Sequence, residues 1–163
     1  MPFADPHVSV TQTEDGRWKL DRPLTYSDDG VTAVIEPGYV TDFATVPRII
    51  WWLVPTYGNY TAATVLHDWM ITDLLPTGQI TSQRVDRVFR EAMKALGVSM
   101  PRRWLMWAGV RWGALFNPDR RAGWHKTAPG VLLISALALP FLLPALFVVP
   151  SLLIFALLER LFK

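Results

Sequence analysis

The spacing of apolar and polar positions between residues 60 and 97 predicts two amphipathic helices. In the first, from about Tyr60 to Leu74, one stripe recurs every three or four positions, as on one face of a helix. The stripe consists of Tyr60, Ala63, His67, Met70, Ile71 and Leu74. The second helix runs from Thr81 or Ser82 as N-cap to Gly97 as C-terminal stop, with an apolar face. That face consists of Val85, Val88, Phe89, Ala92, Met93 and Leu96.

Two polar residues interrupt these apolar faces. His67 lies on the stripe of the first helix, and Asp86 lies on the inward face of the second or at its border. Since residues 75–80 form a short connection, the helices are expected to pack antiparallel and to bring the carboxylate toward the imidazole. Such a pair is a general-base device, because the carboxylate fixes the tautomer and supports the imidazolium. The alternative is a satisfied histidine of the core.

Two further carboxylates are candidate metal ligands. Asp68 lies about 100° around the helix from His67, so it is free to bind a hard cation. Asp42 follows a predicted type II turn at residues 36–38. It could cap a short helix over 47–53, pair with Arg48, or join Asp68 at a cation. We favour capping or pairing, because Asp before a helix is common.

The first forty residues predict a small antiparallel sheet. Short β-prone segments alternate with turn sequences at 14–17 and 27–30. The segments are Val8–Gln12, Trp18–Leu20, Leu24–Tyr26 and Val31–Ile35. Together with the helices they predict one α+β domain over residues 1–126. The sequence has no cysteine, so no disulfide or thiolate site contributes.

A long apolar segment follows this domain. No charged residue occurs from Thr127 to Leu158, which exceeds the roughly 20 apolar residues that span a bilayer. Residues 127–163 are therefore predicted to be a C-terminal transmembrane anchor. Prolines at 140, 144 and 150 favour one kinked span over a re-entrant piece or a hairpin. Residues 1–5 lack the basic and apolar regions of a signal peptide.

The stretch before the anchor is basic and rich in tryptophan. Residues 1–73 hold four Lys/Arg against ten Asp/Glu, whereas residues 84–126 hold ten against three. A helix is predicted from Pro101 to about Phe116. Cations beside indoles are typical of a membrane interface, which we favour over nucleic-acid binding or core packing. The candidate interface residues are Arg102, Arg103, Trp104, Trp107, Arg111, Trp112, Trp124 and Lys126.

Four sequence blocks, at 41–48, 57–60, 63–69 and 86–93, carry a resemblance to the uncharacterised DUF1353 family. The resemblance covers roughly residues 20–116. Members of that family occur in bacteriophages and in bacterial genomes with prophages, so the resemblance implies a phage context. It implies other virion or tail proteins as partners, and it implies no particular reaction.

A weaker resemblance is to secreted phospholipase A2 enzymes, in which one helix carries a His-Asp pair and the antiparallel helix carries an Asp that orients the His. His67, Asp68 and Asp86 stand in those places. The resemblance implies that His67 activates water and that Asp68 holds Ca²⁺, with Asp42 and the backbone of residues 38–43 as further candidate ligands. The sequence departs from that family by lacking its cysteines and its glycine-dense calcium loop.

Two functions follow as hypotheses. One is a membrane-tethered, calcium-dependent lipid-ester hydrolase with His67 and Asp86 as catalytic residues, in which His67 is the base, Asp86 orients it and Asp68 holds Ca²⁺ as the electrophile. The other is a non-catalytic protein of the phage virion, its tail or the host cell membrane, in which the same residues form a buried polar network. An opening beside His67 would favour the first hypothesis, and full internal satisfaction of the polar atoms would favour the second.

Overall fold

The β-prone segments form two small antiparallel sheets in the computed structural model, which describes residues 1–28, 30–43, 51 and 54–162. The first sheet has the order β1-β2-β5, with strands β1 (Val10–Gln12), β2 (Trp18–Leu20) and β5 (Val40–Thr41). The second is the hairpin of β3 (Leu24–Asp28) and β4 (Val31–Ile35). The predicted α+β class is confirmed, with two sheets in place of one.

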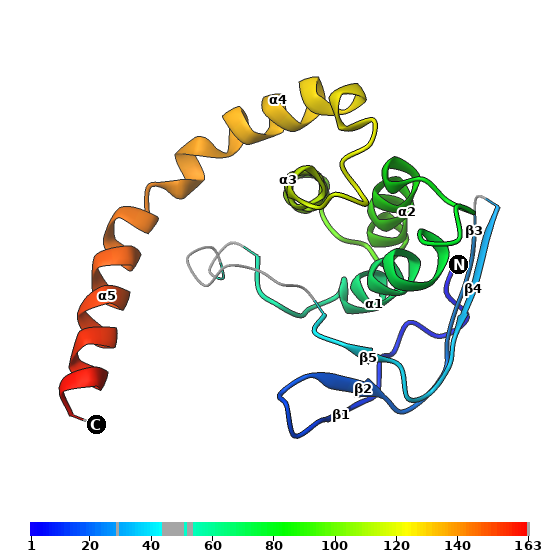
Figure 1. Cartoon of the computed structure of the whole chain (residues 1–163), viewed down its shortest axis with the longest axis horizontal. Coiled ribbons are helices and arrows are strands. Elements are labelled where there is room, and N and C mark those ends of the chain that lie inside the picture. The colour runs from blue at the N-terminus through cyan, green and yellow to red at the C-terminus, as the bar shows by residue number, and fades with distance from the viewer. Residues whose placement is uncertain (29, 44–50, 52–53, 163) are drawn as a thin grey trace.

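One face of the β3–β4 hairpin forms one side of the main hydrophobic core. Val31, Ala33 and Ile35 alternate with exposed residues, so one face of the hairpin is buried. That face packs against helix α1 (Thr61–Trp69), as Figure 1 shows. The turn that leads from β4 toward β5 has the predicted type II form, because Tyr39 N donates to Glu36 O at 3.3 Å and Gly38 has φ +95°.

The two predicted helices are present and pack on each other. Helix α1 continues into a π-helical turn, η2 (Met70–Leu74), and α2 covers Ser82–Ala95. Thr81 caps α2 through its side chain, which accepts a bond from Arg84 N. Gly97 ends the helix with φ +73°, and Val98 N donates back to Met93 O at 3.0 Å.

Helix α3 (Met100–Phe116) lies between α2 and the C-terminal segment. On one side it packs against α2, and on the other it packs against α4 (Ala128–Ala138). Trp107, Ala108 and Val131 form the buried centre of the α3–α4 contact. A short 3₁₀ turn, η3 (Trp124–Lys126), connects the two helices.

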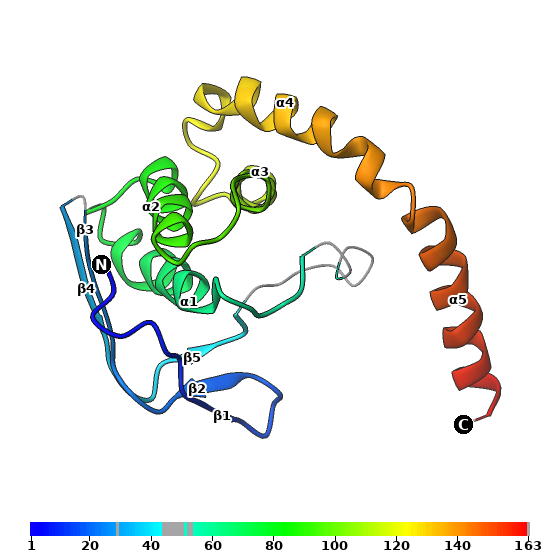
Figure 2. The same ribbon diagram turned by 180° about the vertical axis from the view of Figure 1, so that it is seen from behind.

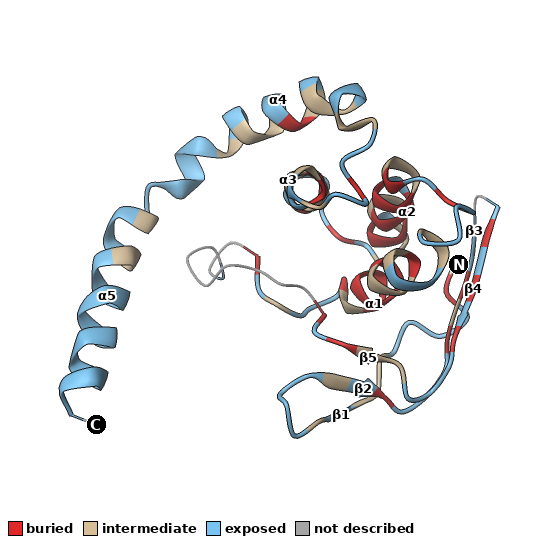
Figure 3. Ribbon diagram, in the orientation of Figure 1, coloured by how far each residue is buried: buried red, intermediate tan, exposed pale blue. Residues whose placement is uncertain are grey.

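The C-terminal segment leaves the body of the molecule after α4. It continues through η4 (Leu139–Leu142) into α5 (Ala145–Leu161), which runs away from the other helices in both views (Figures 1 and 2). No residue of α5 is buried, and Figure 3 shows it almost wholly exposed. Among the described residues, no single helix is long and apolar enough to cross a membrane. By length and composition alone, residues 128–142 and 145–161 pass that test together as a pair bent by 66°.

The predicted short helix over 47–53 and the pairing of Asp42 with Arg48 lie outside the described residues. The predicted boundary at residue 127 falls between elements that pack on each other, because α4 is held against α3.

Candidate functional site

The site is organised around Asp86, which is fully buried on the inward face of α2. Its Oδ1 lies 2.7 Å from His67 Nε2, so the contact expected between the two antiparallel helices is present. Two arginines share the same carboxylate. Arg120 Nη2 donates to Oδ1 at 2.7 Å, and Arg111 Nη1 donates to Oδ2 at 2.8 Å.

These partners keep Asp86 ionised in a dry environment. Burial alone would raise the pKa of the carboxyl, but the hydrogen bond with His67, the charge of Arg120 and the hydrogen bond from Arg111 lower it below its ordinary value. Removing one member of such a cluster leaves a buried charge without compensation. Asp86 therefore also anchors the arrangement structurally.

Arg111 occupies a different place from the one expected for it. We expected it at a membrane interface, whereas its side chain is fully buried and also bonds to Ser82 Oγ and Thr127 Oγ1 at 3.0 and 3.1 Å. Its spacing from Trp104, Trp107 and Ala108 on α3 puts all four on one helical face, a signal that could have identified it as inward-facing.

Arg120 was also missed as a site residue. It follows α3 in a turn in which its backbone N–H bonds to Asn117 O at 3.1 Å. A turn has no hydrophobic period, so nothing in the local pattern places its side chain inside the molecule. The structure nevertheless leaves only 10% of that side chain exposed.

Asp68, the next residue after His67, has a separate environment. Thr41 of β5 donates to its Oδ2 at 2.6 Å. Burial, with the negative charge of Asp42, raises the pKa of Asp68 to about 7 against the opposing effects of Thr41 and Arg120. Thr41 Oγ1 also accepts a bond from the backbone N–H of Phe43, which adopts a left-handed φ of 63°. Such strain in a non-glycine residue is common beside functional sites.

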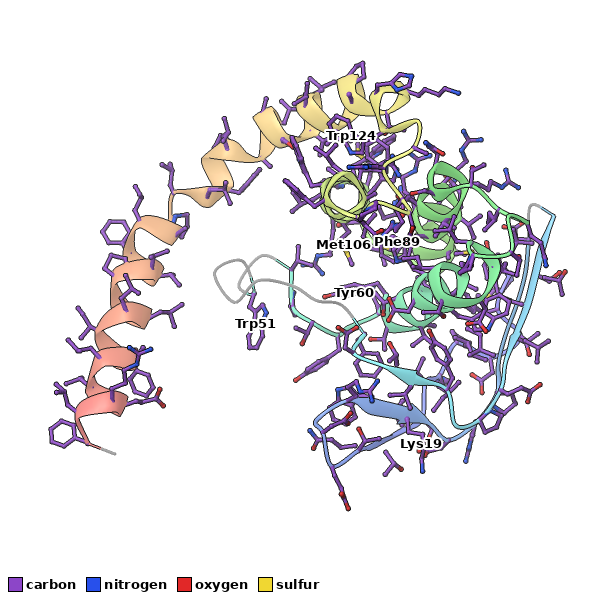
Figure 4. The ribbon with its side chains drawn as sticks, in the orientation of Figure 1. Lys19, Trp51, Tyr60, Phe89, Met106 and Trp124 are labelled. Carbon is purple, nitrogen blue, oxygen red and sulfur yellow. The ribbon has the colours of Figure 1, made fainter. Side chains whose placement is uncertain are left out.

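His67, Asp68, Asp42 and Arg120 line one pocket of about 590 Å³. The rest of its wall is mostly apolar and comes mainly from α3, with further residues from α1, η2, α2, α4, η4 and the segment before α1. Its apolar residues include Ile71, Phe89, Leu105, Met106, Val110, Ala138, Leu139 and Leu142. In Figure 4, Phe89 and Met106 lie between α3 and the α1–α2 pair. The pocket therefore has a charged end and an apolar wall.

Three polar atoms at the charged end have no hydrogen-bond partner among the described residues. They are His67 Nδ1, Asp68 Oδ1 and Arg120 Nη1, and all three belong to residues that line the pocket. Arg120 Nε, which is buried, has no partner either. With Nε2 assigned as the protonated nitrogen that donates to Asp86, Nδ1 carries a free lone pair. The arrangement offers a base, a carboxyl group and a cation to a molecule in the pocket.

The predicted calcium ligands meet only part of what calcium requires. Asp42 and Asp68 lie at the same end of the pocket, but two carboxylates provide fewer than the six to eight oxygens that Ca²⁺ takes. The positive charge of Arg120 is close enough to affect the pKa of Asp68, so it would also repel a cation bound there. No group of three or more His, Cys, Asp or Glu suited to a metal occurs in the described part of the chain. The two carboxylates alone therefore supply only part of a calcium coordination shell.

The tryptophans of the candidate interface mainly join α3 to the segments after it. Trp107 is buried, and Trp104, Trp112 and Trp124 are half-buried around it. Trp112 Nε1 donates to Ser135 Oγ of α4 at 3.0 Å, and Trp124 Nε1 donates to Arg111 O at 2.6 Å.

Of the cations in that set, Arg102 and Lys126 are exposed, whereas Arg103 is half-buried. Arg90, from α2, covers the ring of Trp104 with its guanidinium carbon 4.1 Å from the ring centroid. An interfacial role is thus open to the exposed cations and to the rims of the half-buried indoles.

A family model described as "Protein of unknown function (DUF1353)" matches residues 18–110. No curated protein and no solved structure matches the chain. The matched range contains His67, Asp68, Asp86 and Asp42, and it ends before Arg111 and Arg120.

Proposed function

We propose that this chain, which belongs to the DUF1353 family, hydrolyses esters of lipid-like substrates at a membrane. The family description assigns no reaction, so the residues of the site carry the proposal. The observation that carries the proposal is the shared pocket, whose mostly apolar wall includes His67, a residue whose Nδ1 is not used by the contact with Asp86. Pockets that bind small molecules are mainly apolar, with a few polar groups that fix orientation.

In this proposal His67 is the general base. Its Nδ1 takes a proton from a water molecule as the water oxygen bonds to the ester carbonyl carbon. The carbon–oxygen bond to the alcohol then breaks, and the imidazolium returns the proton to the departing alcohol oxygen. The products are one carboxylic acid and one alcohol, so water is the only co-substrate and no oxidant is needed.

Asp86 has a specific and limited part in this mechanism. It accepts from Nε2 and thereby fixes the tautomer that leaves Nδ1 free. Its charge is already shared with Arg111 and Arg120, so it stabilises the imidazolium less than an unshared carboxylate would. We therefore assign Asp86 mainly to orientation of the ring.

The C-terminal segment supports the membrane part of the proposal. Leu139 and Leu142 of η4 line the pocket, and the adjoining α5 presents apolar side chains without covering them. Phe147, Ile154 and Phe155 are each at least 60% exposed. We propose that α5 enters or lies on a bilayer, with the exposed cations near residues 102 and 126 at its surface. A lipid could then reach the pocket along an apolar path.

The second candidate is a structural protein of a phage particle or of the host membrane. One observation favours it: Asp86 receives three charged or polar partners, more than a catalytic dyad needs. A network of this kind stabilises one arrangement of three helices and needs no substrate. The phage context itself stays a prediction from the sequence resemblance.

Filling the pocket distinguishes these functions. Gly109 and Gly113 of α3 line the pocket, and a Cβ at either position would meet no atom within 4 Å. Gly109→Leu should occupy the space of an acyl chain while favouring the helix, since glycine costs about 1 kcal/mol in a helix interior. The exposed Ala136→Leu is the matched control outside the pocket.

The measurement compares dodecanoyl and acetyl esters in mixed micelles, with the full chain and both variants. The proposal expects the parent and Ala136→Leu to prefer the dodecanoyl ester, and Gly109→Leu to lose that preference while keeping turnover of the acetyl ester. An unchanged preference in Gly109→Leu would remove the pocket from the proposal. Absence of turnover in every protein would favour the structural candidate.

A further inference from the structure

The charged end of the pocket contains a guanidinium that is only partly used. Arg120 gives one Nη2 hydrogen bond to Asp86. Its Nε is buried without a partner, its Nη1 has none among the described residues, and the residue lines the pocket. The side chain is nine-tenths buried, so little of it is open to water.

A guanidinium held this way is suited to an oxygen that gains negative charge. Its position is fixed by Asp86, so it need not reorganise when charge develops on a bound group. Burial also strengthens the interaction, because solvent screens it less than at a surface.

The charges around Arg120 limit the chemical class of ligand that the pocket favours. Arg111 and Arg120 exceed Asp86 by one positive charge, and the carboxyl groups of Asp42 and Asp68 line the same pocket as Arg120. A ligand with a permanently dianionic group would be repelled by those carboxylates. A neutral carbonyl group is not repelled by these carboxylates when it binds. It becomes an oxyanion only during the reaction, and Arg120 then attracts the negative charge as it forms.

Resting on the proposed ester hydrolysis, we infer that Arg120 is a further catalytic residue, whose free N–H groups hold the substrate carbonyl oxygen and stabilise its oxyanion. It takes the electrophilic role that the phospholipase resemblance assigns to Ca²⁺, for which Asp42 and Asp68 form an incomplete ligand set. His67 acts on the water and Arg120 acts on the carbonyl oxygen, both from the charged end of one pocket.

Two ketones with the same apolar chain test this inference without needing turnover. A long-chain trifluoromethyl ketone is hydrated in water, and its geminal diol copies the tetrahedral adduct of water with an ester. The matching methyl ketone remains a ketone. Binding to the full chain in mixed micelles is followed by ¹⁹F NMR for the first compound and by competition for the second. The inference expects the parent to prefer the trifluoromethyl ketone by about 100-fold or more, the lower range for transition-state analogues.

The variants are Arg120→Gln, Arg120→Lys and the exposed neighbour Arg121→Gln as control. Arg120→Gln should reduce the preference by about 10- to 100-fold, the range for a hydrogen bond to a charged group. Arg120→Lys should keep part of it, and Arg121→Gln should keep all of it. Asp86 retains His67 and Arg111 in each Arg120 variant, and thermal unfolding verifies that the variants are folded.

The outcomes separate the two proposals. Equal preference in the parent and Arg120→Gln, or no preference in the parent, overturns the inference even if esters are hydrolysed. An Arg120-dependent preference without ester turnover supports the inference about the oxyanion site and counts against hydrolysis. If esters are hydrolysed, Arg120→Gln should lower kcat more than it changes KM, and chelation of calcium should leave the parent rate unchanged.

Discussion

The body of the molecule and its C-terminal segment distribute charge and apolar surface in opposite ways. In the body, Asp86 and Arg111 have no exposed surface, so the molecule places charge inside its helix packing. In α5 no residue is buried, so apolar side chains lie outside. Burying charge is costly unless partners compensate it, and exposing apolar area to water costs about 25 cal/mol per Å².

Neither arrangement is the usual one, because folded proteins mostly bury apolar side chains and expose charged ones. The buried charges of the body position His67 at a pocket, and the exposed apolar surface of α5 supports the proposal that this helix meets a bilayer. Helix α4 and η4 join the two parts, because Val131 packs into the body while Leu139 and Leu142 line the pocket. Changes to the buried charges of the body and changes to the apolar C-terminal segment therefore give different predictions.

Removing the central carboxylate should have the largest effect on stability. Asp86→Ala leaves two arginines without their shared partner, and breaking a buried ion pair in this way costs about 3–5 kcal/mol. The exposed Asp119→Ala should change stability by less than about 0.5 kcal/mol. Denaturant unfolding of the two variants beside the parent measures both values. An Asp86→Ala midpoint equal to that of the parent would contradict the role assigned to the cluster.

Shortening the C-terminus at two points should separate α4 from α5. Deletion of residues 145–163 removes no buried side chain of the described residues, so unfolding of the body should be nearly unchanged. Deletion from residue 127 uncovers Trp107 and removes Val131, at a cost of roughly 2–3 kcal/mol for the buried apolar surface.

The same pair of deletions tests the membrane proposal. The full chain should pellet with vesicles after a high-salt wash, and the chain without residues 145–163 should remain in the supernatant. Persistent pelleting of the shortened chain would assign membrane attachment to another surface.

Asp68 should give a smaller, pH-dependent effect. The pKa of its carboxyl rises from 3.8 to about 7 on folding, so the folded protein binds this proton more tightly than the unfolded chain does. The stabilisation is fully present below about pH 4 and is lost as the pH rises to about 7. Asp68→Asn keeps an acceptor for Thr41 and cannot ionise.

Relative to the parent, Asp68→Asn should therefore gain roughly 1–3 kcal/mol between pH 4 and pH 8, since one pKa unit corresponds to about 1.4 kcal/mol. Thermal unfolding at a series of pH values measures the difference. A difference that stays constant across this range would show that Asp68 titrates normally.

The sequence was sufficient for the helices and for one contact of the site. The stripes of α1 and α2 put His67 and Asp86 on facing surfaces, and the short connection left antiparallel packing as the simple arrangement. The Schellman turn at Gly97 and the type II turn at Gly38 follow from local backbone requirements of the same kind.

The remaining parts of the site depend on contacts that local patterns do not encode. Arg111 stands among tryptophans, a composition that also suits a membrane interface, and only the packing of α3 on α2 turns it inward. Arg120 lies in a turn without a period. Strand β5 has two residues, and its pairing with β2 brings Thr41 to Asp68 across 27 positions of sequence.

The catalytic role of His67 is the central claim, and a paired measurement of rate and stability tests it. His67→Ala is compared with His125→Ala, which changes an exposed histidine, by dodecanoyl ester hydrolysis in mixed micelles and by thermal unfolding. We predict that His67→Ala loses about 10²- to 10⁴-fold in rate while remaining folded, and that His125→Ala matches the parent. Equal rates in the parent and in both variants, or no hydrolysis by the parent together with a lowered unfolding temperature of His67→Ala, would contradict a catalytic role and leave His67 as a member of a structural network.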